Sequence, residues 1–296
     1  MAHLFRPTLV HAPSALGLSA RGVEHLPQAL LDAGLAERLH ALPGPRLDPP
    51  PHGTQVDAGS GVLNAAAIAS FSLGLADAVG QVLDEGGFPL VLGGDCSIVL
   101  GNLLALRRRG RPGLFFIDAH SDFYLPEVLP DGEAASMDLA FATGRGPAVV
   151  AALEGRRPLV RDEDVVVYGR RDAPEADRFH SPRIEDTAIL QIDLQAVRTE
   201  GAAASAHRAV ARLEAQPIDG YWLHLDADAL DDAVMPAVDY RLPGGLSWDE
   251  LVAALRVALH RPKARGMHVG IFNPELDRGG AVARAMVDAL GRAFEP

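Results

Sequence analysis

The stretch Gly113-Leu-Phe-Phe-Ile-Asp-Ala-His-Ser-Asp-Phe123 decides the fold, because an apolar run ends abruptly in acidic and imidazole side chains. Such a run is typical of a strand that is buried on both faces of a parallel sheet. The same pattern occurs in Pro89–Asp95, Asp164–Tyr168, Gly220–Asp226 and Gly266–Phe272. Segments with helical spacing of Ala and Leu separate these runs, at 63–83, 98–109, 202–213, 249–259 and 281–294. Strands that alternate with helices predict an α/β fold in which helices cover both faces of a parallel sheet.

Composition and charge narrow the class of protein. The chain has 296 residues, of which 48% are hydrophobic and 22% charged, an ordinary globular balance. Its net charge of −12 argues against binding to nucleic acid, and its one cysteine excludes an intrachain disulfide. Met1–Arg6 has no signal-peptide pattern, and no run approaches the ~18 consecutive apolar residues of a membrane span. We therefore expect a cytoplasmic protein with a small-molecule substrate and with neither nucleic acid nor membrane as a partner.

Three local patterns predict loops and a helix start. The proline-rich segment Leu42–Thr54 favours a surface loop with polyproline character. Tyr124–Pro147 directly follows a predicted strand and is expected to be a loop that shapes a substrate pocket. Ser247-Trp-Asp-Glu250 has the spacing of a capping box and predicts the start of a helix.

Acidic side chains gather where the predicted strands end. Asp118, His120 and Asp122 alternate with small residues, so in an extended chain they would share one side. Asp226 and Asp228 likewise follow an apolar run, although a solvated acidic turn is an alternative for this pair. Carboxylates and an imidazole at neighbouring strand ends would repel one another without a cation, so the pattern predicts a divalent metal site.

Cys96 lies in Gly93-Gly-Asp-Cys-Ser-Ile98, a glycine turn that enters a helix. A lone cysteine is often only a small buried hydrophobe. The neighbouring acids favour the alternative, a metal ligand.

Three segments, Gly93–Ser97, Ile117–Asp122 and His224–Asp231, resemble in order and spacing the signatures of the arginase/agmatinase/formiminoglutamase (ureohydrolase) superfamily. Pro243-Gly-Gly-Leu-Ser and Phe272-Asn-Pro274 resemble it too. The resemblance implies one domain over residues 1–296, with a three-layer α/β/α fold and a parallel sheet of about eight strands. It also implies two Mn²⁺ ions, a bridging hydroxide that attacks a guanidinium or amidine carbon, and a homo-oligomer (dimer, trimer or hexamer).

The resemblance also implies roles for individual residues. It implies that Asp118 and Asp226 bind both metals, that Asp122 binds the first, and that His120 and Asp228 bind the second. Asp122 would in addition orient the nucleophile and take its proton. Asp231 is either a helper of this reaction or an ordinary turn residue.

The sequence departs from the family pattern at three places. Cys96 stands where a histidine ligand is usual, and a thiolate there would also suit Zn²⁺ or Fe²⁺. Ala135 stands where a loop histidine usually serves the leaving amine, so Glu133, Asp138 or His180 is expected to supply the proton. Ile271 stands where guanidine-specific members have a Glu that pairs with the substrate, so the substrate-binding candidates here are Glu133, Asp138 and Ile271. His224 and His268 are expected to be buried structural residues.

These observations favour a metal-dependent hydrolase of C–N bonds in linear amidines or substituted guanidines, with arginine itself disfavoured. Two alternatives remain open. Cys96 suggests an Nω-hydroxyarginine hydrolase, and the missing residues are compatible with a metal-binding pseudoenzyme or regulatory subunit. No Gly-x-Gly-x-x-Gly and no Gly-Lys-Ser/Thr occurs, which argues against dinucleotide and P-loop enzymes.

Overall fold

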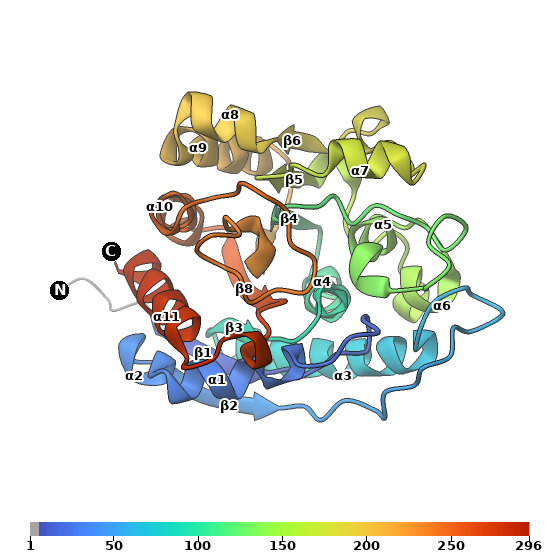
Figure 1. The fold of residues 1–296 in the computed structure, drawn as a ribbon, viewed down its shortest axis with the longest axis horizontal. Coiled ribbons are helices and arrows are strands. Elements are labelled where there is room, and N and C mark those ends of the chain that lie inside the picture. The colour runs from blue at the N-terminus through green and yellow to red at the C-terminus, as the bar shows by residue number, and fades with distance from the viewer. Residues whose placement is uncertain (1–5, 296) are drawn as a thin grey trace.

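The computed structural model describes residues 6–295, so the N-terminal residues 1–5, which we examined for a signal peptide, lie outside it. An eight-stranded sheet runs through the molecule in the order β2-β1-β3-β8-β7-β4-β5-β6, and all neighbouring strands are parallel. The strands are β1 (Pro7–His11), β2 (Leu42–Arg46), β3 (Phe88–Leu92), β4 (Pro112–Ile117), β5 (Val165–Tyr168), β6 (Leu190–Ile192), β7 (Gly220–Asp226) and β8 (Ala264–Gly270). The parallel eight-stranded sheet that we expected is confirmed (Figure 1).

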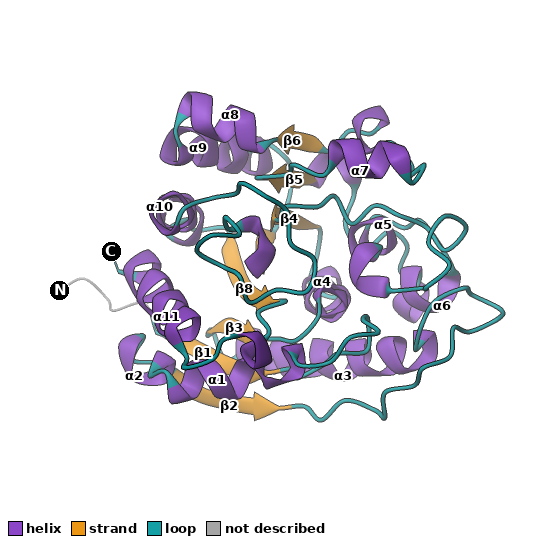
Figure 2. Ribbon diagram, viewed as in Figure 1, coloured by secondary structure: helices purple, strands orange, loops and turns teal. Residues whose placement is uncertain are grey.

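Helices lie on both sides of this sheet (Figure 2). They are α1 (Leu26–Asp32), α2 (Leu35–Arg38), α3 (Ala65–Asp84), α4 (Val99–Arg107), α5 (Asp138–Ala142), α6 (Ala148–Ala151), α7 (Ala173–Arg178), α8 (Leu194–Glu200), α9 (Ala202–Glu214), α10 (Trp248–Leu259) and α11 (Ala281–Phe294). Short 3-10 helices also occur, at Val23–His25 (η1), Cys96–Ile98 (η2), Ala134–Ser136 (η3), Leu153–Gly155 (η4), Asp162–Asp164 (η5), Ile184–Asp186 (η6), Ala227–Ala229 (η7) and Pro274–Leu276 (η8). The five helices expected from periodicity correspond to α3, α4, α9, α10 and α11, and α10 begins with the predicted capping box of Ser247 and Glu250.

Side-chain alternation along the strands divides the apolar core into two layers. In β4, Phe115 and Ile117 join a core shared with α1, α2 and α8 to α11. Leu114 and Phe116 point the other way, into a core shared with α3 to α6. Every residue of β4 is buried, which explains the unbroken apolar run in the sequence. The three-layer α/β/α arrangement follows from this two-sided burial.

Two expected loops contain regular structure. Leu42–Arg46, within the proline-rich segment expected to be a surface loop, forms the edge strand β2. Pro43 and Pro45 are tolerated there because an edge strand pairs on one side only and needs fewer backbone N–H groups. The segment Tyr124–Pro147 is not wholly irregular, because η3 and α5 lie within it. The short strands β1 and β6 carry little apolar sequence of their own and were not predicted.

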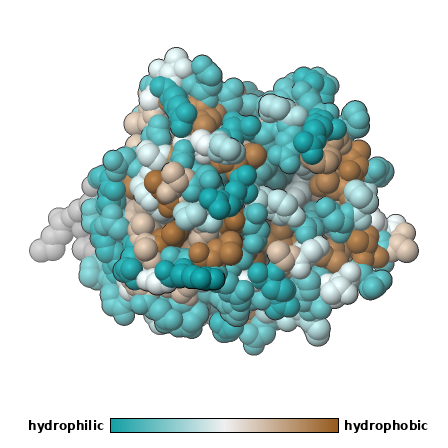
Figure 3. Space-filling model, viewed as in Figure 1, coloured by the Kyte–Doolittle hydropathy of each residue, from teal (hydrophilic) through white to brown (hydrophobic). Residues whose placement is uncertain are grey.

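Helix α3 is long and apolar enough to cross a membrane by length and composition alone. In this fold it packs along α4, and residues such as Ile68, Leu75 and Val79 are buried in the core. A core helix therefore accounts for its composition. Figure 3 shows a face of the molecule on which hydrophilic residues predominate, with smaller hydrophobic groups between them.

Candidate metal centre

The strand register brings the acids of two sequence motifs to one place. β4 and β7 are neighbours, with Phe116 opposite His224 and Ile117 opposite Leu225. Asp118 directly follows β4, and Asp226 is the last residue of β7, so both lie at the carboxyl edge of the sheet. Because side chains alternate along a strand, Asp118, His224 and Asp226 all point to the side on which α4 lies. Ligands collect at this edge in open parallel sheets.

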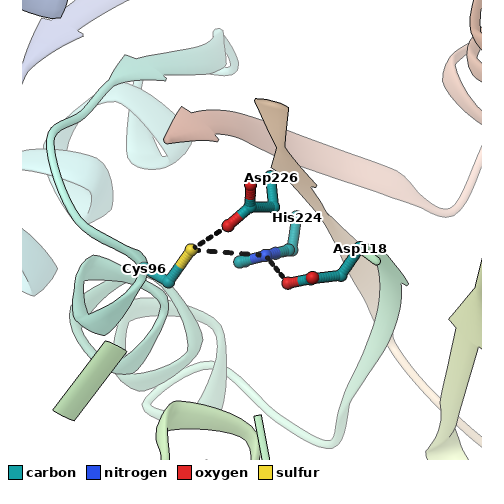
Figure 4. Close-up of side chains that lie close together, drawn as sticks. All are labelled: Cys96, Asp118, His224 and Asp226. Carbon is teal, nitrogen blue, oxygen red and sulfur yellow. Dashed lines mark hydrogen bonds and ion pairs between the residues drawn. The ribbon is translucent and has the colours of Figure 1, made fainter. Parts of the chain in front are cut away.

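Cys96 approaches the same acids from the turn after β3 (Figure 4). Its Sγ donates to Asp226 Oδ2 at 2.8 Å, and His224 Nε2 lies 3.8 Å from Sγ and 3.3 Å from Asp118 Oδ2. All four side chains are buried. The structure therefore joins the glycine-turn motif to both acidic motifs.

The turn that presents Cys96 is fixed by Asp95, whose carboxylate accepts hydrogen bonds from the Ser97 N–H and the Ser14 hydroxyl, both at 2.9 Å. Gly94 permits this close packing, because a Cβ there would lie 1.6 Å from the backbone oxygen of Ser14. The glycine turn thus allows two backbone segments to pack closely, and this packing places the Cys96 side chain at the cluster.

The segment after Asp118 leaves the strand, so it is not extended as the alternation suggested. Asp122 has a φ of 44°, a left-handed conformation that is uncommon outside glycine. His120 and Asp122 consequently reach opposite sides of Asp118. His120 Nδ1 lies 2.9 Å from Asp228 Oδ2, whereas Asp122 groups with Cys96.

Three overlapping groups of potential metal ligands result. In each group, one ligand atom per residue lies within 4.8 Å of the others. The groups are Cys96, Asp118, His224 and Asp226; Cys96, Asp122 and Asp138; and Asp118, His120 and Asp228. Every residue that the sequence suggested as a ligand belongs to at least one group. Because Asp118 belongs to two of them, one centre with two neighbouring cation positions is compatible with the geometry.

The chemistry of this cluster fits bound cations. Among residues 6–295, the ion pairs of Asp118 and Asp228 are with His120 and His224, and none joins the buried acids of the cluster to Arg or Lys. Burial, together with Asp118 and Asp138, raises the pKa of Asp122 well above its ordinary value. Burial and the neighbours Asp228 and Asp118 raise the pKa of Asp226 in the same way. Repulsion of this kind between desolvated carboxyl groups is relieved by a divalent cation.

Residues after β5 hold the loops of the cluster in place. The Asp172 carboxylate accepts hydrogen bonds from both the backbone N–H and the hydroxyl of Ser121, each at 2.9 Å. The guanidinium of Arg171 donates to the backbone oxygens of Asp228, Leu230 and Leu242. Arg171 therefore binds loop backbone and leaves the cluster's acidic side chains without a guanidinium partner.

The other candidate residues lie around this centre. Asp231 accepts a hydrogen bond from the Ala233 N–H at 2.8 Å, as a turn residue does, and its carboxylate is in none of the three groups. Glu133 is buried and accepts from the Ser19 N–H at 2.7 Å and the Tyr240 hydroxyl at 2.8 Å. His180 is exposed and also lies outside the groups.

Ile271 is buried just beyond β8 with a φ of 69°, a strained conformation for a β-branched residue. Its N–H donates to the Gly94 oxygen at 2.8 Å, which ties it to the turn that presents Cys96. Backbone strain therefore occurs at Asp122 and Ile271, both at the carboxyl edge.

The sequence analysis expected only a structural role for His224, but this residue also lies at the cluster. Its ring stacks on Phe116 with centroids 3.9 Å apart, as a structural histidine would. Its Nε2 nevertheless faces the cluster, and its buried Nδ1 has no hydrogen-bond partner within the described residues 6–295. Its position two residues before Asp226 on the same strand face was the available signal. His268, by contrast, is buried below the cluster and accepts a hydrogen bond from Trp222 Nε1 at 2.8 Å.

Comparison with known proteins identifies the family to which this chain is similar. The model of the arginase family matches residues 7–294. An arginase of Bacillus caldovelox is 31% identical, with 97% of each chain covered. A solved structure of the B. caldovelox arginase superposes with a TM-score of 0.88 at 29% identity, and one of the Bacillus cereus arginase with 0.86 at 28%, each covering 98% of both chains.

Arginase-family proteins depend on two metal ions, and the ligand groups described above are suited to hold such ions. The family match covers nearly the whole chain, and the eight-stranded parallel sheet agrees with it. This chain belongs to the arginase family, and it is a hydrolase that acts on C–N bonds in linear amidines.

Proposed function

We propose that this chain hydrolyses a C–N bond of a substituted guanidine or linear amidine at a centre of two divalent cations, Mn²⁺ in the first instance. The observation that carries the proposal is the convergence of Cys96, Asp118 and Asp226 from three separate motifs at the edge of the sheet. Buried acids without cationic side chains are costly unless a metal neutralises them.

Six residues would hold the cations. Asp118 and Asp226 would bridge the two positions, Cys96 and Asp122 would complete one, and His120 and Asp228 the other. The Nδ1 atom of His120 already faces Asp228 at 2.9 Å, so this nitrogen is the one directed at the second position. Zn²⁺ or Fe²⁺ would also suit the Cys96 side, because a thiolate is a softer ligand than imidazole or carboxylate.

The cations, when bound, would lower the pKa of a water molecule enough to make it a nucleophile near neutral pH. The chain's own contribution is to orient that water and to hold its proton. Asp122 is suited to this task, because its carboxylate lies within ligand reach of Cys96 at the centre itself. Asp231 would contribute only indirectly, through the turn in which it accepts the Ala233 N–H.

The substrate is proposed to differ from arginine. Ile271 offers no charge to a guanidinium, and Ala135 offers no proton to a leaving amine. A buried cation without its partner costs about 3–5 kcal/mol, or roughly two to three orders of magnitude in transition-state binding. Glu133 is the nearest substitute along the loop, but Ser19 and Tyr240 already bind its carboxylate.

A panel assay tests the proposal. Mn²⁺-loaded protein would be incubated with arginine, agmatine, Nω-hydroxyarginine, guanidinobutyrate and formiminoglutamate, with urea, ammonia and amide products measured. We expect turnover of at least one substrate and weak turnover of arginine. Ile271→Glu should raise the activity toward guanidines, and arginine turnover at ordinary arginase rates would refute the substrate argument.

Nω-hydroxyarginine is the second candidate substrate, and Cys96 is the feature that favours it. If the protein binds two cations but turns over none of the panel, the proposal of a pseudoenzyme or regulatory subunit replaces that of a hydrolase for these substrates. We further propose that residues 1–296 act as one domain in a cytoplasmic homo-oligomer, which sedimentation of the purified protein would test.

A further inference from the structure

Asp138 is the most unusual buried acid of the chain. It begins α5, its exposed fraction is 0%, and neither carboxylate oxygen has a hydrogen-bond partner among residues 6–295. The Leu139 N–H lies nearby, but it makes no hydrogen bond of normal geometry with the carboxylate. A buried carboxylate in this condition is among the costliest groups a fold can contain.

Asp95 is a buried acid in the same region whose carboxylate does have hydrogen-bond partners. It is equally inaccessible, but its two oxygens accept hydrogen bonds from Ser14 and Ser97. Asp138 has no such donors, so hydrogen bonding within the protein does not explain why the carboxylate is there.

The unpartnered carboxylate of Asp138 is directed at the cluster. One of its oxygens, Cys96 Sγ and an oxygen of Asp122 all lie within 4.8 Å of one another. Such spacing suits three donors around one cation, because ligand atoms that each lie ~2.0–2.3 Å from a metal are themselves ~3–4.6 Å apart. A substrate contact is a poorer explanation, because an Asp138 oxygen lies within 4.8 Å of ligand atoms of both Cys96 and Asp122, two proposed ligands.

We propose that Asp138 is an additional metal ligand on the Cys96 side of the centre. This inference rests on the cations of the proposed function and extends it. The Cys96 side would then be surrounded by one thiolate and four carboxylates, those of Asp118, Asp122, Asp138 and Asp226, whereas the His120 side keeps an imidazole. A metal-bound cysteine is deprotonated.

The extra ligand changes the charge of the centre. Five carboxylates and one thiolate would carry six negative charges against the four positive charges of two divalent cations. The excess negative charge is suited to a cationic substrate, and it would provide the electrostatic compensation that Ile271 does not. Asp138 would thus link two departures from the family pattern, Cys96 among the metal ligands and Ile271 at the substrate site.

Metal binding and unfolding together test this inference. Asp138→Asn keeps the shape of the side chain and removes its charge, and Glu127→Gln makes the same change at an exposed position of the same loop. Affinities for Mn²⁺ and Co²⁺ would be measured by chelator competition. We expect one of the two cations to bind at least about tenfold more weakly to Asp138→Asn, since even groups that only orient ligands change affinity by ~10–100-fold. Glu127→Gln should bind both as the wild type does.

The Co²⁺ form reports on the Cys96 side alone. A thiolate-to-Co²⁺ charge-transfer absorption should appear in the wild type and be absent from Cys96→Ser, which assigns it. In Asp138→Asn this absorption should require a higher Co²⁺ concentration. If Asp138→Asn binds both cations and develops the absorption as the wild type does, the inference is overturned.

Thermal unfolding separates a ligand from a structural residue. Without metal, Asp138→Asn should be as stable as the wild type or more so, because it replaces an unpartnered buried carboxyl group by a neutral group of the same shape. With metal, it should gain less stability than the wild type, since ligand binding stabilises in proportion to affinity. An equal loss of Tm with and without metal in both Asp138→Asn and Asp138→Ala would show a structural role and overturn the inference.

The outcomes distinguish this inference from the proposed function. Absent turnover with intact metal binding would overturn only the proposed reaction. Two tightly bound cations in the wild type and in Asp138→Asn would overturn only the role of Asp138. A wild type that binds no divalent cation would overturn both.

Discussion

Buried carboxylates have different partners at the two edges of the sheet. At the amino edge, Asp164 is fully buried and both of its oxygens bind the Arg111 guanidinium, at 2.6 and 2.9 Å. At the carboxyl edge, Asp118 is equally buried, and its oxygens meet the His120 N–H at 2.7 Å, His120 Nδ1 at 3.7 Å and His224 at 3.3 Å, with no Arg or Lys partner among residues 6–295. The amino edge is electrostatically complete within the protein. The acids of the carboxyl edge have no such guanidinium partner among residues 6–295, which is compatible with a metal centre.

The largest effect that tests this comparison concerns the two acids proposed to bridge. Asp118→Asn or Asp226→Asn should cause loss of both cations, because each residue would ligate both positions. Since even indirect groups change metal affinity by ~10–100-fold, we expect a fall of more than about 100-fold in affinity and a corresponding loss of turnover. Elemental analysis of the purified variants checks this, and full metal content in either one would contradict the bridging assignment.

The sequence predicted this carboxyl edge better than the rest of the fold. Apolar runs such as Gly113–Ile117 predict central strands because both faces are buried, and the residue that follows each run then lies at a known edge. The edge strand β2 was missed, since Pro43 and Pro45 obscure its pattern and only tertiary pairing with β1 makes it a strand.

Within the site, the places of residues that directly follow strands could be derived from the strand pattern, whereas places that depend on chain reversal could not. Asp118 and Asp226 take their places from register alone. Asp122 could be assigned to the Cys96 side only through the family resemblance, because it reaches that side through a positive φ, and the position of Asp138 depends on the path of a long loop. The absence of hydrogen bonds to Asp138 is a tertiary property that has no local sequence signal.

The second prediction concerns pH. Burial, with the neighbouring acids, raises the folded-state pKa of Asp122 and Asp226, and burial and nearby carboxylates raise the pKa of the Cys96 thiol. As pH rises, the unfolded chain releases protons from such groups before the folded protein does, so the metal-free protein should lose stability as the pH rises through and above about 8.5, the ordinary pKa of a cysteine thiol.

The histidines do not reverse this sign. Despite its burial, the pKa of His120 is raised by Asp228 and Asp118, so the stability it contributes is also lost as pH rises through its folded-state pKa. Burial lowers the pKa of His224 to about 3, and burial also lowers the pKa of His268. Both side chains are nevertheless neutral in the folded and in the unfolded protein above about pH 7. Stabilisation by metal should instead grow with pH, because ligands must be deprotonated to bind. Melting curves with Mn²⁺ and with chelator measure the two slopes, and slopes of the same sign would contradict the prediction.

A smaller effect is expected at the amino edge. Asp164→Asn breaks a buried ion pair, but Arg111 is partly exposed and retains Glu163 at 3.0 Å. We therefore expect a loss of about 1–3 kcal/mol in the free energy of unfolding, less than for a fully enclosed pair. Metal content should not change. Denaturant titration with elemental analysis checks both, and a loss of bound metal would mean that the two edges are coupled.

The smallest effect is expected where the centre meets solvent. The Tyr240 side chain is about half exposed, and its hydroxyl donates to Glu133 Oε2 at 2.8 Å. Tyr240→Phe removes one hydrogen bond, worth about 0.5–1.5 kcal/mol, and leaves Glu133 bound to the Ser19 N–H. If Glu133 contacts the substrate, as the sequence analysis expects, KM should change by less than about tenfold while kcat and metal content stay constant, since Tyr240 belongs to none of the ligand groups. Steady-state kinetics on the best substrate of the panel measure this difference. A fall in kcat with unchanged KM would instead show that the Glu133–Tyr240 pair takes part in the reaction itself. The buried metal cluster and the Glu133–Tyr240 pair could then no longer be treated as separate parts of the site.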